Sequence, residues 1–271
     1  MNRNKPIFSL ALLALIVLCC AFAGLLAPYP PAAMDSAAVN LAPCRAHPFG
    51  TDNMGRDLFT MVLYGGRASL IIGLASAALS TFIAVVYGTA SGLAGERTDD
   101  LLMRTVELLM SLPSILVILF LQAWWGQPTY LSLSVIIGIT SWMNIAKIVR
   151  SEVRQIGESD YILAARTMGG GFWYILRRHL LPNFVPAIMF MVVSNISSAI
   201  ITESTLSFLG LGLPLTEVSW GSLLSMSQEA LLSNYWWIIV IPGTVLILTL
   251  VCITNLGEYI RRSNTRLFSN L

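Results

Sequence analysis

Charged residues are scarce in this chain of 271 residues, because Lys, Arg, Asp and Glu together make up 11% of it. Soluble domains typically contain about 25%. The charges are missing from five long runs, which lie between Lys5 and Asp35, Arg67 and Glu96, Glu107 and Lys147, Arg178 and Glu203, and Glu229 and Glu258. A helix needs about 20 apolar residues to cross the hydrocarbon core of a bilayer. The runs therefore exclude an ordinary soluble domain and predict an integral membrane protein.

The recognisable catalytic and nucleotide-binding motifs are also absent. The only lysines, Lys5 and Lys147, precede Pro6 and Ile148, so the chain has no phosphate-binding loop of the Gly-x-x-x-x-Gly-Lys-Ser/Thr type. It has no His-Glu-x-x-His zinc pair and no Gly-x-Ser-x-Gly nucleophile elbow. We therefore expect no catalytic, cofactor or metal site on this chain, and no enzyme activity of its own.

Cysteine is too sparse for a disulfide framework. Cys19, Cys20 and Cys252 fall inside apolar runs, and Cys44 has no plausible partner. We interpret Cys44 and His47 as parts of a solvated loop rather than metal ligands.

Six transmembrane helices are predicted in one domain that spans residues 1–271, because the third run is long enough for two crossings and is interrupted by Trp-Trp-Gly-Gln-Pro at 124–128. The expected spans are 7–27, 68–92, 102–123, 131–149, 185–206 and 236–256. A closed β-barrel is the other way to satisfy the backbone in lipid, but these runs are too long and do not alternate. The fold class is therefore all-α.

The first apolar run allows two interpretations. Ala21-Phe22-Ala23 resembles a signal-peptide cleavage site. The run is longer than a typical signal core, which favours an uncleaved anchor.

Basic residues predict the orientation. With six spans both termini share a side, and that side holds thirteen of the sixteen Lys and Arg residues, whereas Arg45, Arg56 and Arg67 fall on the other. Such a bias places both termini in the cytoplasm. Because these residues serve as topology markers and the formal net charge is only +2, we expect a lipid environment and no nucleic-acid partner.

Three features of the spans predict the shape and packing of the helices. Small residues recur every three or four positions in the second span, namely Gly73, Ala77, Ser80, Ala84, Gly88 and Ser91. This stripe favours close helix packing over substrate contact. Pro113 should kink the third span, and Asn195 should bond to a neighbouring helix.

A polar, aromatic and basic stretch at 151–184 interrupts the apolar pattern. Within it, Ala164-Ala165, Gly169 and Leu181-Pro182 are spaced by three and eleven residues. The pattern resembles the EAA loop of ABC importer permeases, with Leu163 in place of its Glu and His179 in place of its Ile. The resemblance implies that this loop couples the chain to ATPase subunits through Ala164, Ala165, Gly169, Leu181 and Pro182. We expect a helix, a turn at 169–171 and a second helix.

Two more segments resemble the C-type permease of the peptide/nickel branch of that family. One is Gly-Thr-Asp-Asn-Met-Gly-Arg-Asp at 50–57, and the other runs from Glu203 to Gly212 and continues to Trp220-Gly221. The resemblance implies an all-α type I permease bundle in the bacterial cell membrane. It further implies a second homologous permease, two ATP-binding subunits that carry ATP and Mg²⁺, and an extracytoplasmic solute-binding protein. Peptides, nickel and metal chelates remain open as substrates.

The same resemblance assigns the outer gate and binding-protein side to Asp52, Arg56, Asp57, Glu203, Gly210, Gly212 and Trp220. Asp52, Arg56 and Asp57 favour a self-satisfied loop over a calcium site, and Gly55 should adopt an unusual backbone angle. Glu203, expected at the outer end of its span, is either a functional group or a structural cap.

The alternative function is a stand-alone secondary transporter or channel. Such proteins carry intramembrane charges, broken helices or inverted repeats. The predicted spans are almost free of charge at their centres, which favours the ABC permease.

Overall fold

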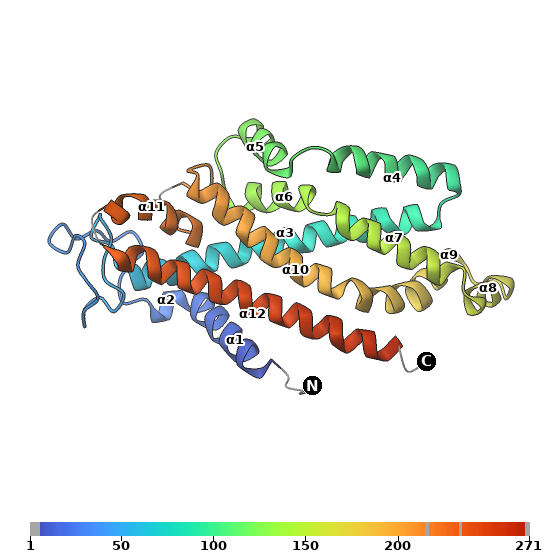
Figure 1. The fold of residues 1–271 in the computed structure, drawn as a ribbon, viewed down its shortest axis with the longest axis horizontal. Helices are drawn as coiled ribbons and strands as arrows, with labels where there is room; N and C mark the ends of the chain where they lie inside the picture. The colour runs from blue at the N-terminus through green and yellow to red at the C-terminus, as the bar shows by residue number, and fades with distance from the viewer. Residues whose placement is uncertain (1–5, 215–216, 233–234, 269–271) are drawn as a thin grey trace.

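The chain folds into an elongated bundle of helices (Figure 1). The computed structural model describes residues 6–214, 217–232 and 235–268, and within these residues the only β-contact is an isolated bridge between Thr51 and Asp57. The helices are α1 (Ile7–Ala21), α2 (Ala23–Leu26), α3 (Leu58–Leu93), α4 (Glu96–Met110), α5 (Ser114–Trp125), α6 (Tyr130–Thr140), α7 (Met143–Gly157), α8 (Asp160–Thr167), α9 (Phe172–Ile175), the π-helix η1 (Leu176–Leu180), α10 (Leu181–Phe208), α11 (Trp220–Leu232) and α12 (Trp236–Phe268).

The bundle has two distinct ends. The loop 27–57 and α11 lie at one end, called the α11 end below, and α8 and α9 lie at the other, the α8 end (Figure 1). The long helices α3, α10 and α12 run between them, and α3 packs against α6, α7 and α10. Helices α1 and α12 run in opposite directions, so α1 begins and α12 ends on the side of the α8 end (Figure 1).

All six apolar segments of the sequence form helices, but only three of them form a single long one. Leu58–Leu93, Leu176–Phe208 and Trp236–Ser263 are each long and apolar enough to cross a membrane. Two further pairs of helices are long and apolar enough only when taken together, and each pair is bent, α4 with α5 by 84° and α6 with α7 by 47°; Ile7–Ala21 is a shorter apolar helix.

The bend in the third span follows from its proline. Pro113 has no N–H, so the helix stops at Met110 and restarts at Ser114. The kink predicted at this residue is confirmed, but the angle is large enough to divide the expected span 102–123 into two short helices.

The break between α6 and α7 has no proline, and it divides the expected span 131–149 between two helices bent by 47°. The Thr140 hydroxyl donates to the carbonyl oxygens of Ile136 and Ile137, at 2.9 and 3.0 Å, and the Ser141 hydroxyl donates to Ile137 at 2.7 Å. These hydroxyls partner the carbonyls where α6 ends. Trp142 is buried beside Tyr87, with ring centroids 4.7 Å apart.

Helix α3 begins ten residues before the expected boundary at 68. The Asp57 side chain accepts a hydrogen bond from the Thr60 main-chain N–H at 2.8 Å and so caps the helix. The expected span begins directly after Arg67 because this residue is charged, but Arg67 lies within α3 and its side chain is exposed on the helix surface. A single charge that reaches the surface does not end a helix.

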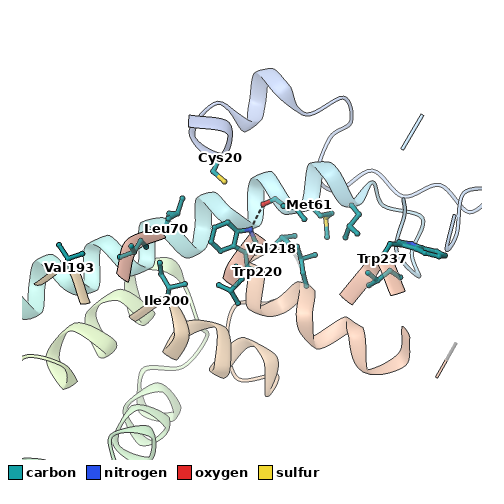
Figure 2. Close-up of a cluster of buried hydrophobic side chains, with 14 residues drawn as sticks. Cys20, Met61, Leu70, Val193, Ile200, Val218, Trp220 and Trp237 are labelled. Atoms are coloured by element: carbon teal, nitrogen blue, oxygen red, sulfur yellow. Dashed lines mark hydrogen bonds between the residues drawn. The ribbon is translucent and has the colours of Figure 1, made fainter. Parts of the chain in front are cut away.

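Buried aromatic and aliphatic side chains hold the α11 end together (Figure 2). Trp220, at the start of α11, is fully buried against α3, and its Nε1–H donates to the Val62 carbonyl oxygen at 3.0 Å. The Trp237 Nε1–H donates to the Thr51 carbonyl oxygen at 3.1 Å and ties α12 to the loop. Both indoles therefore satisfy their one polar group while they fill the core.

The small residues of α3 permit close packing, as the sequence predicts. A Cβ on Gly73 would lie 2.5 Å from Ile200 Cγ1, and one on Gly88 would lie 2.6 Å from the Ala146 carbonyl oxygen. Asn195 extends the contact, since its Nδ2 donates to the Ser80 hydroxyl at 2.5 Å. The stripe thus packs α3 against α7 and α10.

Candidate functional site

The loop before α3 contains a buried ion pair. Arg56 Nε lies 2.7 Å from Asp52 Oδ2, and the two side chains are 4% and 1% exposed. Asp52 Oδ1 also accepts hydrogen bonds from the main-chain N–H groups of Met54 and Arg56, at 2.9 and 2.8 Å. Asp52 and Arg56 therefore form the self-satisfied loop that the sequence predicts.

Asp57 has a different role from its two neighbours. It caps α3, and its Oδ1 lies 3.0 Å from His47 Nδ1. Gly55 adopts a φ of +72°, and a Cβ there would lie 1.9 Å from the Asp35 carbonyl oxygen. The expected backbone angle is confirmed, and no other residue fits this close approach.

Glu203 lies near the end of α10, as expected, and its side chain is fully buried. It accepts hydrogen bonds from the hydroxyls of Ser69 at 2.9 Å and Ser207 at 2.8 Å. Ser69 Oγ in turn accepts from the Trp220 main-chain N–H at 3.2 Å. One carboxylate thus joins α3, α10 and the start of α11, which favours the structural alternative for Glu203.

The other residues expected beside Glu203 divide into two groups. Gly212 lies against Ser207, where a Cβ would meet Oγ at 2.0 Å, and Trp220 completes the same buried region. Gly210 is exposed, with a φ of +76°, and turns the chain after α10. Residues 215–216, between these glycines and Trp220, lie outside the described residues.

At the opposite end, α8 terminates in a hydrogen-bonded turn. Gly169 has a φ of +85°, and the Gly170 main-chain N–H donates to the Ala165 carbonyl oxygen at 2.9 Å. This geometry is the Schellman motif, which places glycine four residues after the accepting residue. The Ala165-to-Gly169 spacing is therefore explained by how the helix ends, and the expected helix–turn–helix is confirmed.

Helix α8 presents an apolar surface and is anchored by one side chain. Ile162 is fully buried in the core of the α8 end. Tyr161 and Leu163 are both 48% exposed, Met168 is 87% exposed, and Ala164 is exposed between them. We call Tyr161, Leu163, Ala164 and Met168 the α8 surface.

The Leu-Pro pair lies where the chain re-enters the bundle. Pro182 cannot donate to the carbonyl four residues back, and the turn before it is a wide π turn in which the Leu181 N–H donates to the Leu176 carbonyl oxygen. Pro182 is exposed and Leu181 is half-buried. Leu181 and Pro182 thus shape the path from η1 into α10 and do not contribute to the α8 surface.

The sequence indicated no role for His179, which is noted there only because it replaces the Ile of the family pattern. Its ring contacts those of Tyr161 and Tyr174, with centroid distances of 6.0 and 5.6 Å. The imidazole therefore joins α8 to η1 through aromatic contacts.

Asp99 forms a charged cluster that sequence reasoning missed. The Asp99 side chain is 1% exposed. Its carboxylate accepts hydrogen bonds from the Ser91 hydroxyl at 2.5 Å, from Arg150 Nε at 2.6 Å and from Arg154 Nη1 at 2.7 Å. Arg150 Nη2 also donates to this carboxylate. The carboxylate joins the end of α3 and the start of α4 to α7. Because α7 leads directly into α8, the cluster fixes the base of the α8 surface.

A cavity of about 540 Å³ lies between the two helix breaks and α10. The 111–113 break contributes Leu112 and Pro113, the 141–142 break contributes Ser141, and α10 contributes Asn195, Ser198 and Thr202. No Lys, Arg, Asp, Glu or His is among the described residues that line it. The sequence contained no signal for this cavity beyond Pro113.

Comparison with known families and proteins identifies the chain. Residues 84–265 match the family described as "binding-protein-dependent transport system inner membrane component", and residues 4–43 match the N-terminal transmembrane domain of oligopeptide transport permease C. The chain belongs to this family of transport-system membrane components. It is therefore a multi-pass permease subunit of an ABC transporter, as the motifs predicted.

Relatives extend over most of the chain. The dipeptide transport system permease protein DppC of Bacillus subtilis is 39% identical over 219 residues, which cover 81% of this chain and 68% of that protein. The oligopeptide permease OppC of the same organism is 33% identical over 260 residues, 96% of this chain and 85% of the relative. A putative peptide permease of Brucella suis is 36% identical over 262 residues, 96% and 86% of the two chains.

The fold is also found among solved structures. A chain of the MetNI methionine ABC transporter, in inward-facing conformations, superposes with a TM-score of 0.63 at 16% sequence identity, covering 75% of this chain and 96% of that one. The fold class is thus confirmed as that of a membrane ABC permease, and the family sets aside a stand-alone channel or secondary transporter.

Proposed function

We propose that this permease forms half of the transport pathway of an ATP-driven peptide importer. The relatives named for dipeptide and oligopeptide transport support peptides over nickel or metal chelates as the substrate class. On this proposal a second homologous permease forms the other half, and an extracytoplasmic solute-binding protein delivers the peptide.

The observation that carries the coupling role is the exposed apolar α8 surface. Tyr161, Leu163 and Met168 are large side chains that project at the end of the bundle, and Ala164 between them leaves the backbone open to close approach. An apolar helical surface of this kind suits a groove on a partner protein. Two ATP-binding subunits, which would hold ATP and Mg²⁺, are the proposed partners.

The mechanical link supports the same role. Motion imposed on α8 reaches α7 directly, and Asp99 joins α7 to α3 and α4 through Arg150 and Arg154. The two helix breaks lie farther along these same bent pairs. Closure of the ATPase subunits would therefore alter the pathway through connected helices, with no nucleotide bound to this chain.

Orientation follows from the positive-inside bias. The proposal places the α8 end and both termini in the cytoplasm and the α11 end outside, where Asp52, Arg56, Asp57, Gly210, Gly212 and Trp220 would lie on the binding-protein side. In a bacterium this membrane is the inner, or plasma, membrane.

Reconstitution tests the proposal. The permease, copurified with its partner subunits, is placed in proteoliposomes with ATP and the binding protein, and uptake of radiolabelled trialanine is compared with uptake of ⁶³Ni²⁺. We expect trialanine uptake that requires both ATP and the binding protein. A complex that lacks any ATPase subunit yet still transports would overturn the coupling role, and nickel uptake without peptide uptake would overturn the substrate class.

A further inference from the structure

The cavity of about 540 Å³ is built at the two positions where apolar spans are interrupted. Non-helical backbone at membrane depth is tolerated where it is buried in protein or lines a cavity. Residues 111–113 and 141–142 are such backbone, and both breaks contribute to the lining. The volume falls in the range of roughly 300–1,000 Å³ that is typical of small-molecule sites.

One face of α10 closes the cavity with polar side chains. Asn195, Ser198 and Thr202 are spaced by three and four residues, so they lie on the same side of the helix. Asn144, in the first turn of α7, lines the cavity as well and is exposed. A polar face therefore contacts a space inside an otherwise apolar segment.

The hydrogen bonds of these side chains show which of them are available to a ligand. The Thr202 hydroxyl donates to the Ser198 carbonyl oxygen at 2.8 Å, and Asn195 Nδ2 is engaged by Ser80. Among the described residues, no hydrogen bond is formed by the Asn144 amide or by the Ser198 hydroxyl. Asn144 and Ser198 can thus both donate and accept, and Asn195 retains its carbonyl oxygen.

We propose that this cavity is the part of the transport pathway contributed by this subunit, and that it holds a peptide through its backbone amides. The inference rests on the proposed peptide-import function. Asn144 and Ser198 match a peptide unit, which carries one N–H donor and one C=O acceptor. The apolar remainder, such as Leu112, Val117 and Ile139, contacts the side chains without selecting among charges.

The neutral lining also suits release. A pathway must bind its substrate well enough to admit it and weakly enough to let it go. Hydrogen bonds between uncharged groups are about half as strong as those to an ionised group. A cavity with no ionisable side chain among its described lining residues therefore holds a peptide briefly and does not trap its charged termini.

Uptake by the assembled transporter in proteoliposomes tests the inference. Asn144→Leu and Ser198→Val should each lower the initial rate of trialanine uptake by about 3- to 10-fold. The loss should be equal within about twofold for Ala-Lys-Ala and Ala-Glu-Ala, because the backbone is what is recognised. The matched control is Asn255→Leu on α12, an exposed asparagine outside the cavity, which should retain the wild-type rate.

The outcomes separate this inference from the proposed function. If wild-type transporter takes up trialanine and both cavity variants match it, the cavity proposal fails and the importer stands. A loss confined to the lysine or the glutamate peptide also overturns backbone recognition. If the wild type takes up none of the three peptides, the proposed substrate class fails and the inference fails with it.

Labelling provides a measurement that does not depend on the rate of transport. Ser198→Cys, in a chain whose four native cysteines are replaced by alanine, should react with a water-soluble maleimide, and trialanine with the binding protein and ATP should slow that reaction several-fold. Thr205→Cys lies on the same helix outside the cavity lining, and its labelling should not respond to peptide. An unreactive Ser198→Cys, or one that peptide does not protect, overturns the proposal.

Discussion

The main-chain N–H of Gly170 donates a hydrogen bond to the carbonyl oxygen of Ala165, 2.9 Å away, and this bond ends α8 at the surface proposed to contact the ATPase. It forms because Gly169, between them, adopts a φ of +85°. The spacing of the family motif thus reflects the geometry of a helix end as well as the surface that the helix presents.

Gly169 substitutions should separate the strain of this turn from the docking contact. A Cβ at Gly169 would meet no atom within 4 Å, so a side chain there would not clash with other residues of this subunit. The positive φ is then the only feature of the subunit that disfavours a substitution. Asn and Asp tolerate the left-handed conformation, whereas most other side chains cost about 1–2 kcal/mol there. We expect Gly169→Asn to retain most peptide uptake, and Gly169→Val to lose more of it.

The pair Gly169→Asn and Gly169→Asp then isolates charge. Gly169→Asp should uncouple transport from ATP hydrolysis while the protein remains inserted, because an added charge beside an apolar docking surface must be desolvated. Uptake, ATP hydrolysis and the amount of permease in the membrane are measured together. Normal uptake by Gly169→Asp would remove the coupling role of this turn.

Asp99→Asn should destabilise the α8 end. The variant leaves the guanidinium groups of Arg150 and Arg154 without their shared carboxylate. Removing one partner of a fully buried pair costs about 3–5 kcal/mol, and the cost here should be lower, about 1–3 kcal/mol, because both arginines are partly exposed to solvent. The melting temperature of the purified transporter and the ratio of uptake to ATP hydrolysis should both fall.

Asp100→Asn is the matched control, since Asp100 is the exposed neighbour on the same helix. It should behave as wild type in both measurements. If the Asp99 and Asp100 variants have the same melting temperature and the same ratio of uptake to ATP hydrolysis, the Asp99 cluster neither stabilises the α8 end nor couples it to transport.

Glu203→Ala should be far more damaging than Glu203→Gln. Alanine removes the acceptor of the Ser69 and Ser207 hydroxyls at a position with no exposure, and each buried polar group left without a partner costs about 1–3 kcal/mol. Glutamine keeps an acceptor oxygen. The difference is measured as thermal stability and as the amount of permease in the membrane. Wild-type stability of Glu203→Ala would show that the Glu203 carboxylate does not hold α3, α10 and α11 together.

Cys44 offers a test of orientation in the native sequence. It is exposed in the 27–57 loop, whereas Cys20 and Cys252 are buried and Cys19 is half-buried within the apolar helix α1. A membrane-impermeant maleimide should therefore label intact spheroplasts at Cys44 and not label the Cys44→Ser variant. Met168→Cys, placed in that variant, should react only in inverted vesicles, and the reverse pattern would place the α8 end outside.

The sequence by itself determined the membrane class, the six apolar segments, the bend at Pro113 and the turn at Gly169. Each of these is a local property: hydropathy is summed over neighbouring residues, proline lacks its own N–H, and glycine alone adopts a positive φ without strain. The family could likewise be predicted from local sequence, because the motifs at 50–57, 160–182 and 203–221 are each contained in one short segment.

The tertiary structure alone decided which distant residues share one site. Asp99 reads as an ordinary turn residue until α7 brings Arg150 and Arg154 to it, 51 and 55 positions along the chain. A hydropathy profile does not reveal the break after Thr140. The carbonyl groups at the helix end are satisfied there by the Thr140 and Ser141 hydroxyls, which belong to the same apolar segment. The cavity exists only because this break and the one at Pro113 meet opposite α10, a relation that depends on packing and not on local sequence.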